Sequence, residues 1–222
     1  MVFLPADSFF MGSYLPSAHN DQGPRRSVAV KGFLIDKHEV TRKQFARLPG
    51  NIGTPGDTCP LCPASSVTWY EARSYCRSRG KRLPTEAEWE YACGAGSRSP
   101  RPWNTLRDSL DRYAWYARNS GGRPRRAGTR LPNEFGLHDM IGNVWEWCAD
   151  RYARDYSGGT GEHSAAGYRV IRGGSWREGE EILGTPLRDR CAPTARHAFI
   201  GFRCAMDAPP GARRTEPGAG DK

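Results

Sequence analysis

Two acidic residues, Asp139 and Glu146, lie in a short segment, residues 136–150, that also contains Gly142 and two tryptophans. Neither an amphipathic helix nor a simple strand requires this mixture, and glycine is favoured where φ is positive, so the segment predicts a folded loop. Carboxylates and backbone carbonyl oxygens are the ligands that a hard cation such as calcium takes. Residue chemistry alone nevertheless favours a loop anchored in the core by its tryptophans, whose acids accept hydrogen bonds from backbone amides.

The cysteines offer a second kind of chemistry. Seven are present, and Cys59 and Cys62 form a Cys-x-x-Cys motif. One such motif could be half of a zinc site, but no second Cys or His pair follows at zinc-finger spacing, so a local disulfide is predicted. Seven cysteines are many for a reducing compartment and favour an extracytoplasmic protein. Because the first residues lack a signal-peptide pattern, the sequence predicts either export with the signal removed or a cytoplasmic protein.

Length and composition predict one full-sized domain. The chain has 222 residues, and its 26 glycines and 17 prolines indicate many turns and short elements. The net charge of +9 would suit a nucleic-acid partner. The arginines are scattered along the chain instead of forming one block, however, so a solvated basic surface is favoured over nucleic-acid binding. No run of 18 apolar residues occurs, and no membrane span is predicted.

Three helix starts are marked by a threonine three positions before a glutamate or glutamine. In this capping-box pattern each side chain accepts a hydrogen bond from a backbone amide that the helix leaves unpaired. The pairs are Thr41 with Gln44, Thr68 with Glu71, and Thr85 with Glu88. The second helix is predicted from Trp69 to about Arg79, and the third from about Glu86 to Cys93.

Strands are predicted near both ends of the chain from short apolar or alternating runs. The predicted strands are residues 2–11, 27–35, 169–172 and 200–205. Residues 98–133 are predicted to be rich in loops, because glycines and basic residues interrupt this segment. The composition after residue 207 changes to Pro, Gly, Ala and charge. We therefore expect a domain over residues 2–207 and a disordered tail over 208–222.

Several short motifs follow one another along the chain. They are Phe10–Gly12, Asp36–Thr41, Arg82–Ala92, Gly136–Trp147, Arg172–Trp176 and Gly201–Arg203. In this order they closely resemble the formylglycine-generating enzyme family, also called sulfatase-modifying factors, over almost the whole chain. The resemblance implies a single compact α+β domain with a divergent C-type-lectin-like fold and little regular secondary structure.

The resemblance also implies a calcium site and two disulfides. Asp139, the carbonyl oxygens of Gly142 and Val144, and Glu146 match a calcium site of the family, which makes calcium the favoured interpretation of that loop. A second family calcium site has no matching ligands in this chain. The disulfides implied by the family pair Cys76 with Cys204 and Cys93 with Cys191. The alternative is four buried free thiols, which cysteine tolerates well; Cys148 receives no role.

The chain departs from the family pattern after Ser175. Catalytic members carry two cysteines there, which bind copper(I) and, with oxygen, oxidise a substrate cysteine to formylglycine. Copper(I) is a soft ion and requires thiolates for this chemistry. In this chain Glu178 stands at the first position, and the second position falls near Leu183. Neither side chain holds copper(I), so copper and formylglycine generation are not expected.

Two functions remain open, because function must be argued from the site and not from the fold. The favoured one is a monomeric binding module whose groove holds a peptide, glycan or protein partner. The groove is predicted to be lined by Arg172, Ser175, Trp176, Arg177 and Glu178. Arg188 and Arg190 would add to a basic rim that attracts acidic or polar ligands. The alternative is an oxidoreductase of the family that oxidises a protein cysteine or a related thiol.

Overall fold

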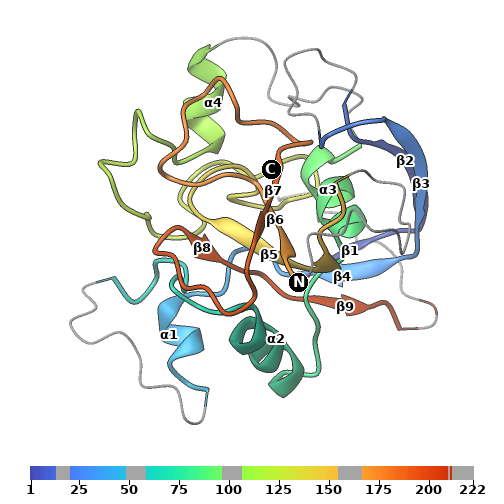
Figure 1. Ribbon diagram of the computed structural model, residues 1–222, viewed down its shortest axis with the longest axis horizontal. Coiled ribbons are helices and arrows are strands. Elements are labelled where there is room, and N and C mark those ends of the chain that lie inside the picture. Colours follow the sequence, from blue (N-terminus) through green and yellow to red (C-terminus); the bar gives the residue numbers. More distant parts are fainter. Residues whose placement is uncertain (14–20, 49–58, 97–106, 155–166, 210, 212–222) are drawn as a thin grey trace, which may run out of the picture.

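Four helices and nine strands make up the regular structure of the residues that the computed structural model describes, namely 1–13, 21–48, 59–96, 107–154, 167–209 and 211. The strands are β1 (Val2–Leu4), β2 (Asp7–Met11), β3 (Arg26–Val30), β4 (Phe33–Ile35), β5 (Trp145–Arg151), β6 (Arg169–Arg172), β7 (Arg188–Cys191), β8 (Ile200–Gly201) and β9 (Ala205–Asp207). The helices are α1 (Arg42–Phe45), α2 (Trp69–Ser78), α3 (Glu86–Gly94) and α4 (Arg107–Tyr113). Long loops join these short elements (Figure 1).

The central sheet has the strand order β7-β6-β5-β8 and passes through the middle of the molecule (Figure 1). Strand β5 pairs antiparallel with β6 and parallel with β8, and α2 and α3 pack against β5. The sequence prediction of a folded loop was therefore wrong for residues 145–151. The first four residues of β5 are all buried, so the strand lacks the alternation of a half-exposed strand and gave no periodic signal.

Two smaller sheets complete the domain. One has the order β1-β4-β9, and the other pairs β2 with β3. The predicted strands 2–11 and 27–35 were correct in position, but each consists of two short strands. The prediction missed α4 and β7, which lie in segments with interspersed charge. The first and last strands of the chain thus share one sheet, β1 and β9 lying on either side of β4.

All three predicted capping boxes are present. In each, the threonine hydroxyl accepts from the backbone amide three residues later, and the Glu or Gln side chain accepts from the threonine amide. Helix α2 ends close to the predicted position, with Gly80 at φ +67° two residues beyond its last residue. A positive φ at this place is typical of a helix C-terminus.

Three buried tryptophans attach the helices to β5. The indole nitrogen of Trp147 donates to the carbonyl of Val67, and that of Trp69 donates to the carbonyl of Cys148. The indole nitrogen of Trp89, on α3, donates to the carboxylate of Glu146. Buried indole N–H groups require such partners, so these bonds fix how α2 and α3 sit on the strand.

Candidate functional site

Three buried carboxylates lie near one another at the start of β5. We call Glu39, Asp139 and Glu146 the acid cluster; their exposed fractions are 1%, 2% and 1%. Asp139 and Glu146 are the acidic residues of the predicted calcium site. Glu39 was not predicted to be part of it, although its motif was noted. Glu39 stands in the largely polar stretch Asp36–Thr41, so its local sequence gave no sign that its carboxylate is buried.

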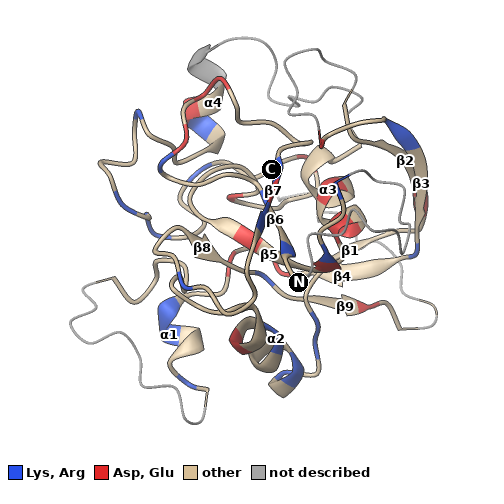
Figure 2. Ribbon diagram, viewed as in Figure 1, with Lys and Arg blue, Asp and Glu red and all other residues tan. Residues whose placement is uncertain are grey.

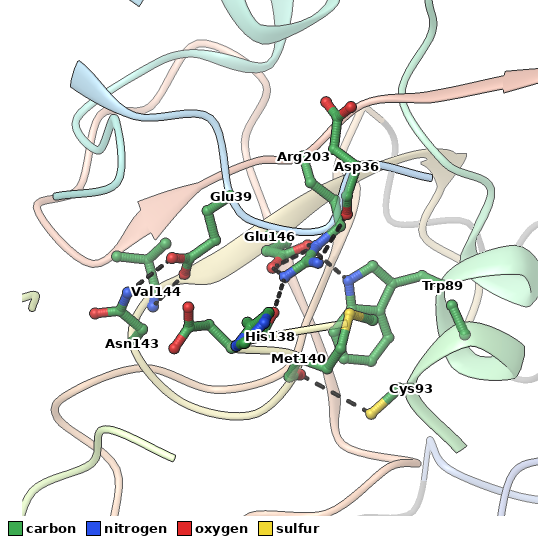
Figure 3. Close-up of polar contacts among 12 residues, drawn as sticks. Asp36, Glu39, Trp89, Cys93, His138, Met140, Asn143, Val144, Glu146 and Arg203 are labelled. Atoms are coloured by element: carbon green, nitrogen blue, oxygen red, sulfur yellow. Dashed lines mark hydrogen bonds and ion pairs between the residues drawn. The ribbon is translucent and has the colours of Figure 1, made fainter. Parts of the chain in front are cut away.

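Glu146 is fully engaged with protein donors. Its two oxygens accept hydrogen bonds from Nε and Nη2 of Arg203 at 2.7–3.0 Å, and Oε2 also accepts from Trp89 at 2.8 Å. Figure 3 shows the carboxylate enclosed between the guanidinium and the indole. Arg203 is 0% exposed, so this is a buried ion pair. Protein donors thus engage both oxygens of Glu146, and its part in a calcium site stays a prediction.

Asp139 differs from Glu146 in having an oxygen without a donor. Its Oδ2 accepts from the amide of Gly128 at 2.6 Å, whereas Oδ1 is buried and has no hydrogen-bond partner. The backbone of Asp139 has φ +54°, an uncommon conformation for a residue with a side chain. Burial raises the pKa of the Asp139 carboxyl. An unpartnered buried carboxylate oxygen is an observation that a hard cation would explain.

Glu39 lies on the other side of the turn. Its carboxylate accepts from Nδ2 of Asn143 at 2.7 Å and from the amide of Val144 at 3.3 Å (Figure 3). Burial, followed by the charges of Asp139 and Glu146, raises the pKa of Glu39 well above its ordinary value. Three carboxylates thus face one guanidinium, that of Arg203. The predicted carbonyl ligands, those of Gly142 and Val144, belong to the same turn.

Gly142 is required where this turn meets the preceding loop. Its φ is +78°, and a Cβ atom would lie 2.3 Å from the carbonyl oxygen of Trp115. The amide of the next residue, Asn143, donates to that same oxygen at 2.7 Å. A side chain here would therefore separate two segments that position the acid cluster.

An open cleft lies over the central sheet on the side of β7. Its volume is about 890 Å³, and its lining residues come mainly from the turn after Ser175, from β7 and from the segment before β8. The charged residues lining it are Asp21, Arg154, Arg177, Glu178, Arg188, Asp189 and Arg190. Aromatic rings line it as well. The guanidinium of Arg177 lies 4.7 Å from the ring of Phe199, and that of Arg190 lies 5.0 Å from the ring of Tyr152.

The predicted groove residues divide between this cleft and the core. Arg177 and Glu178 line the cleft, and so do Arg188 and Arg190. Arg172 is 0% exposed, so its assignment to the groove was wrong. Its guanidinium pairs with the buried carboxylate of Glu90 and donates to the carbonyls of Pro186 and Thr185. In the sequence, Arg172 ends a predicted strand and precedes two glycines, and neither feature indicates that its charge is buried.

Ser175 and Trp176 support the turn at the edge of the cleft. Ser175 is 0% exposed, and both its amide and its hydroxyl donate to Oε2 of Glu178 at 2.6 Å. Trp176 is partly buried, and its amide donates to the carbonyl of Asn143. These contacts give both residues a positioning role within the turn, and their contact with a ligand stays a prediction. The Glu178 side chain holds the turn closed.

Glu178 and Leu183, which the sequence analysis placed at and near the two catalytic cysteine positions, both lie in the described part of the chain. Glu178 lines the cleft, with one carboxylate oxygen bonded to Ser175. Leu183 is 1% exposed and packs against Gly174, where a Cβ would lie 2.4 Å from its Cδ2 atom. One position thus holds an engaged carboxylate and the other a core leucine. No cysteine is among the described residues that line the cleft.

The disulfides differ from the prediction. Cys59 and Cys62 are bridged, which confirms the local disulfide. The sulfurs of Cys76 and Cys204 are buried and lie 2.7 Å apart without a bond between them, so this bridge stays a prediction. Cys93 and Cys191 are separate buried thiols, so the structure does not contain the bridge that the family implies.

The place of Cys93 in the core explains the absence of that second bridge. Its sulfur lies 3.9 Å from the carbonyl oxygen of Met140 and 3.9 Å from the hydroxyl of Thr185. Burial raises the pKa of Cys93 to about 12. Cys191 stands at the end of β7, opposite Arg169. The two residues therefore belong to different surroundings.

The comparisons with known proteins agree with this architecture. The model of the sulfatase-modifying factor enzyme 1-like domain matches residues 1–208, and the chain belongs to that family. The fold is the α+β, C-type-lectin-like fold of the formylglycine-generating enzymes. Among solved structures, Treponema denticola variable protein 1 has a TM-score of 0.81 at 26% identity, covering 94% of this chain and 95% of that one. PvdO from Pseudomonas aeruginosa has a TM-score of 0.80 at 30% identity, covering 93% of both chains.

Two kinds of curated relative are similar over almost the whole chain. The serine/threonine-protein kinase Pkn1 of Chlamydia trachomatis serovar L2 is 32% identical over 93% of this chain, which matches 38% of that protein. The chain therefore spans less than two fifths of that relative's length. The inactive C-alpha-formylglycine-generating enzyme 2 of Bos taurus is 29% identical over 95% of this chain and 90% of its own. No helix in the described part of the chain has the length and apolar character needed to cross a membrane.

Proposed function

We propose that this domain is a recognition module that binds a peptide, glycan or protein partner in the cleft and does not carry out copper-dependent oxidation. The observation that carries the proposal is that Glu178 and Leu183, which stand at and near the positions where the family pattern places two cysteines, supply no thiolate. Copper(I) requires soft thiolate or thioether ligands, and neither a carboxylate nor an aliphatic side chain supplies them. Each of the two side chains also has a structural role, so both positions are adapted to the scaffold.

The chemistry of the cleft supports a polar or acidic ligand. Arg177 and Arg190 are exposed at its edge, and each guanidinium lies over an aromatic ring. A guanidinium held in this way is partly ordered before binding, and it can still form paired hydrogen bonds to a carboxylate. Rings beside the cationic groups add apolar contact area at low entropic cost. Acidic peptide segments and anionic glycans have this combination of charge and flat apolar surface.

The relatives support a role in recognition in two ways. One is named an inactive formylglycine-generating enzyme, and another is named a protein kinase that matches this chain over only part of its length. A domain that recurs within a longer protein, and in a protein called inactive, is consistent with a scaffold used for binding. The proposal for this chain still rests on its own cleft.

The test is a selection of peptides from a random library displayed on phage. We expect enriched sequences to contain Asp or Glu near an aromatic or aliphatic residue, and to lose binding when Arg177 and Arg190 are both replaced by Gln. The matched control replaces Lys31 and Arg77, which are exposed outside the cleft, and should retain binding. Enrichment no better than on bare support would refute recognition of peptides, and equal binding to both double variants would refute binding in the cleft.

We also propose that a calcium ion binds on the Asp139 side of the acid cluster. The free Oδ1 atom and the carbonyl oxygens of Gly142 and Val144 would be its ligands, while Glu146 stays paired with Arg203. A bound cation would offset the excess of carboxylates over guanidinium groups. Calcium at 100 times its dissociation constant should stabilise the fold by about 2.7 kcal/mol.

The calcium proposal is tested by thermal melts with and without calcium. The stabilisation should disappear in Asp139→Asn and persist in Glu134→Gln, an exposed acidic residue outside the cluster. Equal calcium responses in the two variants would place the ion elsewhere. No response in the wild type would refute the calcium site. The excess negative charge of the acid cluster would then be neutralised by protons bound to Glu39 and Asp139.

A further inference from the structure

A second pocket lies beside the Cys59–Cys62 disulfide and shares no described lining residue with the cleft. This basic pocket has a volume of about 500 Å³ and is lined by Arg42, Arg123, Arg125 and Arg126 together with both bridged cysteines. None of its described lining residues is acidic, in contrast to the cleft. Figure 2 shows that basic residues follow one another along the loop between α4 and β5 that supplies three of the arginines.

The disulfide at this pocket is poorly placed to act as a structural staple. It joins residues only three positions apart. The entropic stabilisation by a disulfide grows with the length of the loop that it closes, so this bridge adds less than one joining distant segments. Its two halves differ in exposure, since Cys62 is 4% exposed and Cys59 is more accessible. An attacking group from solvent therefore reaches the sulfur of Cys59 first.

Backbone contacts hold the segments that carry these arginines beside the disulfide. The sulfur of Cys62 lies 3.6 Å from the carbonyl of Pro124, which places the bridge against the basic loop. The amide of Arg125 donates to Asn143, and its guanidinium lies 5.5 Å from the ring of Trp115. The amide of Arg42 donates to the carbonyl of Cys62 at 2.9 Å. Cationic groups near a cysteine favour its thiolate form, which makes it a better leaving group.

We propose that the basic pocket is a thiol–disulfide exchange site for an anionic thiol. The thiolate of the substrate attacks Sγ of Cys59, the Cys59–Cys62 bond breaks, and Cys62 leaves as a thiolate that takes up a proton. A second substrate thiolate attacks the mixed disulfide and releases Cys59. In total, two substrate thiols lose two electrons and two protons to form a disulfide, and the protein gains two thiols. The arginines attract the negative charge of the substrate and stabilise the departing Cys62 thiolate.

The charge of the thiol provides the test. Mercaptoethanesulfonate, mercaptoethanol and cysteamine are anionic, neutral and cationic thiols built on the same two-carbon chain. Reduction of the Cys59–Cys62 bond is followed by alkylation and peptide mapping, and each rate is divided by the thiolate concentration and corrected for thiol basicity. We expect the anionic thiol to react at least about tenfold faster than the cationic one at low salt, with a smaller ratio at high salt.

Two double variants test whether the ratio of the anionic to the cationic thiol rate arises from the basic pocket. Arg123→Gln with Arg126→Gln should reduce it severalfold, because both residues are exposed and line the pocket. Lys31→Gln with Arg77→Gln removes the same charge elsewhere and should leave the ratio unchanged. Equal rates for the three thiols, or the same ratio in both double variants, would overturn the proposal. A bond that resists all three thiols in the folded protein would also overturn it. The recognition cleft is unaffected by either outcome, since it shares no described lining residue with this pocket.

Discussion

Replacement of Glu146 by Gln gives the sharpest stability prediction. The substitution keeps the size of the side chain but removes the one carboxylate that forms hydrogen bonds with Arg203, which is 0% exposed. Gln retains one acceptor oxygen, and its amide group would face the donors of Arg203 and Trp89. Removing one member of a buried ion pair costs about 3–5 kcal/mol, a large part of the 5–15 kcal/mol that stabilises a typical domain.

Urea unfolding followed by tryptophan fluorescence measures this loss. With a slope of about 2–3 kcal/mol per M, the midpoint should fall by roughly 1–2 M. Glu134→Gln, at an exposed site, should change the free energy of unfolding by less than about 0.5 kcal/mol. Replacing both Glu146 and Arg203 by Met should recover much of the loss, since apolar residues can replace a buried pair. A loss below about 1 kcal/mol in Glu146→Gln would refute the inference that this pair organises the cluster.

Three further predictions concern other parts of the core. Burial raises the pKa of Asp150 to about 6 from its ordinary value of 3.8, so its ionisation destabilises the fold as the pH rises from about 4 to about 6. Asp150→Asn should therefore be more stable than the wild type by about 3 kcal/mol at pH 8 and equal to it near pH 3 in denaturant titrations. Non-reducing peptide mapping should recover Cys76 linked to Cys204, whose sulfurs lie 2.7 Å apart. Full alkylation of both residues would show that they are free thiols and would contradict this prediction. Gly142→Ala should lower stability by at least about 2 kcal/mol from a positive φ and a backbone clash, whereas Gly96→Ala, with a similar φ and open space, should cost only about 1 kcal/mol.

Local signals in the sequence predicted local structure well. Each capping box is formed by residues three positions apart, so the starts of α1, α2 and α3 could be read directly. Strand β6 was predicted with its observed ends. Strand β5 was missed because its burial depends on α2 and α3 packing against it, and such packing leaves no period in the sequence.

The candidate site was predicted only in part, because its charges are paired across long distances in the chain. Glu146 and Arg203 are 57 residues apart, and Glu39 and Asn143 are 104 apart. A sequence shows that such residues exist, but not which of them the fold brings together. Arg172 was misassigned for the same reason, since its partner Glu90 lies on α3. The loss of the thiol pair required no such information and could be read from one segment.

The domain has the scaffold of its family, and Glu178 and Leu183 perform structural roles in it. Glu178 closes a turn through Ser175, and Leu183 fills the space beside Gly174. Changing either residue to cysteine would remove these contacts. Replacing both residues by cysteine should therefore destabilise the edge of the cleft.

The central claim is tested most directly by an aldehyde assay on the wild-type protein. Purified protein is incubated with copper(I), oxygen and a peptide containing Cys-x-Pro-x-Arg, and the product is analysed by mass spectrometry. A formylglycine-generating enzyme that carries both thiols serves as the positive control, and a reaction without protein serves as the blank. We expect no aldehyde above the blank, because Glu178 and Leu183 supply no thiolate to hold the copper. Aldehyde formed by this protein above the blank would contradict the recognition account and restore the oxidoreductase.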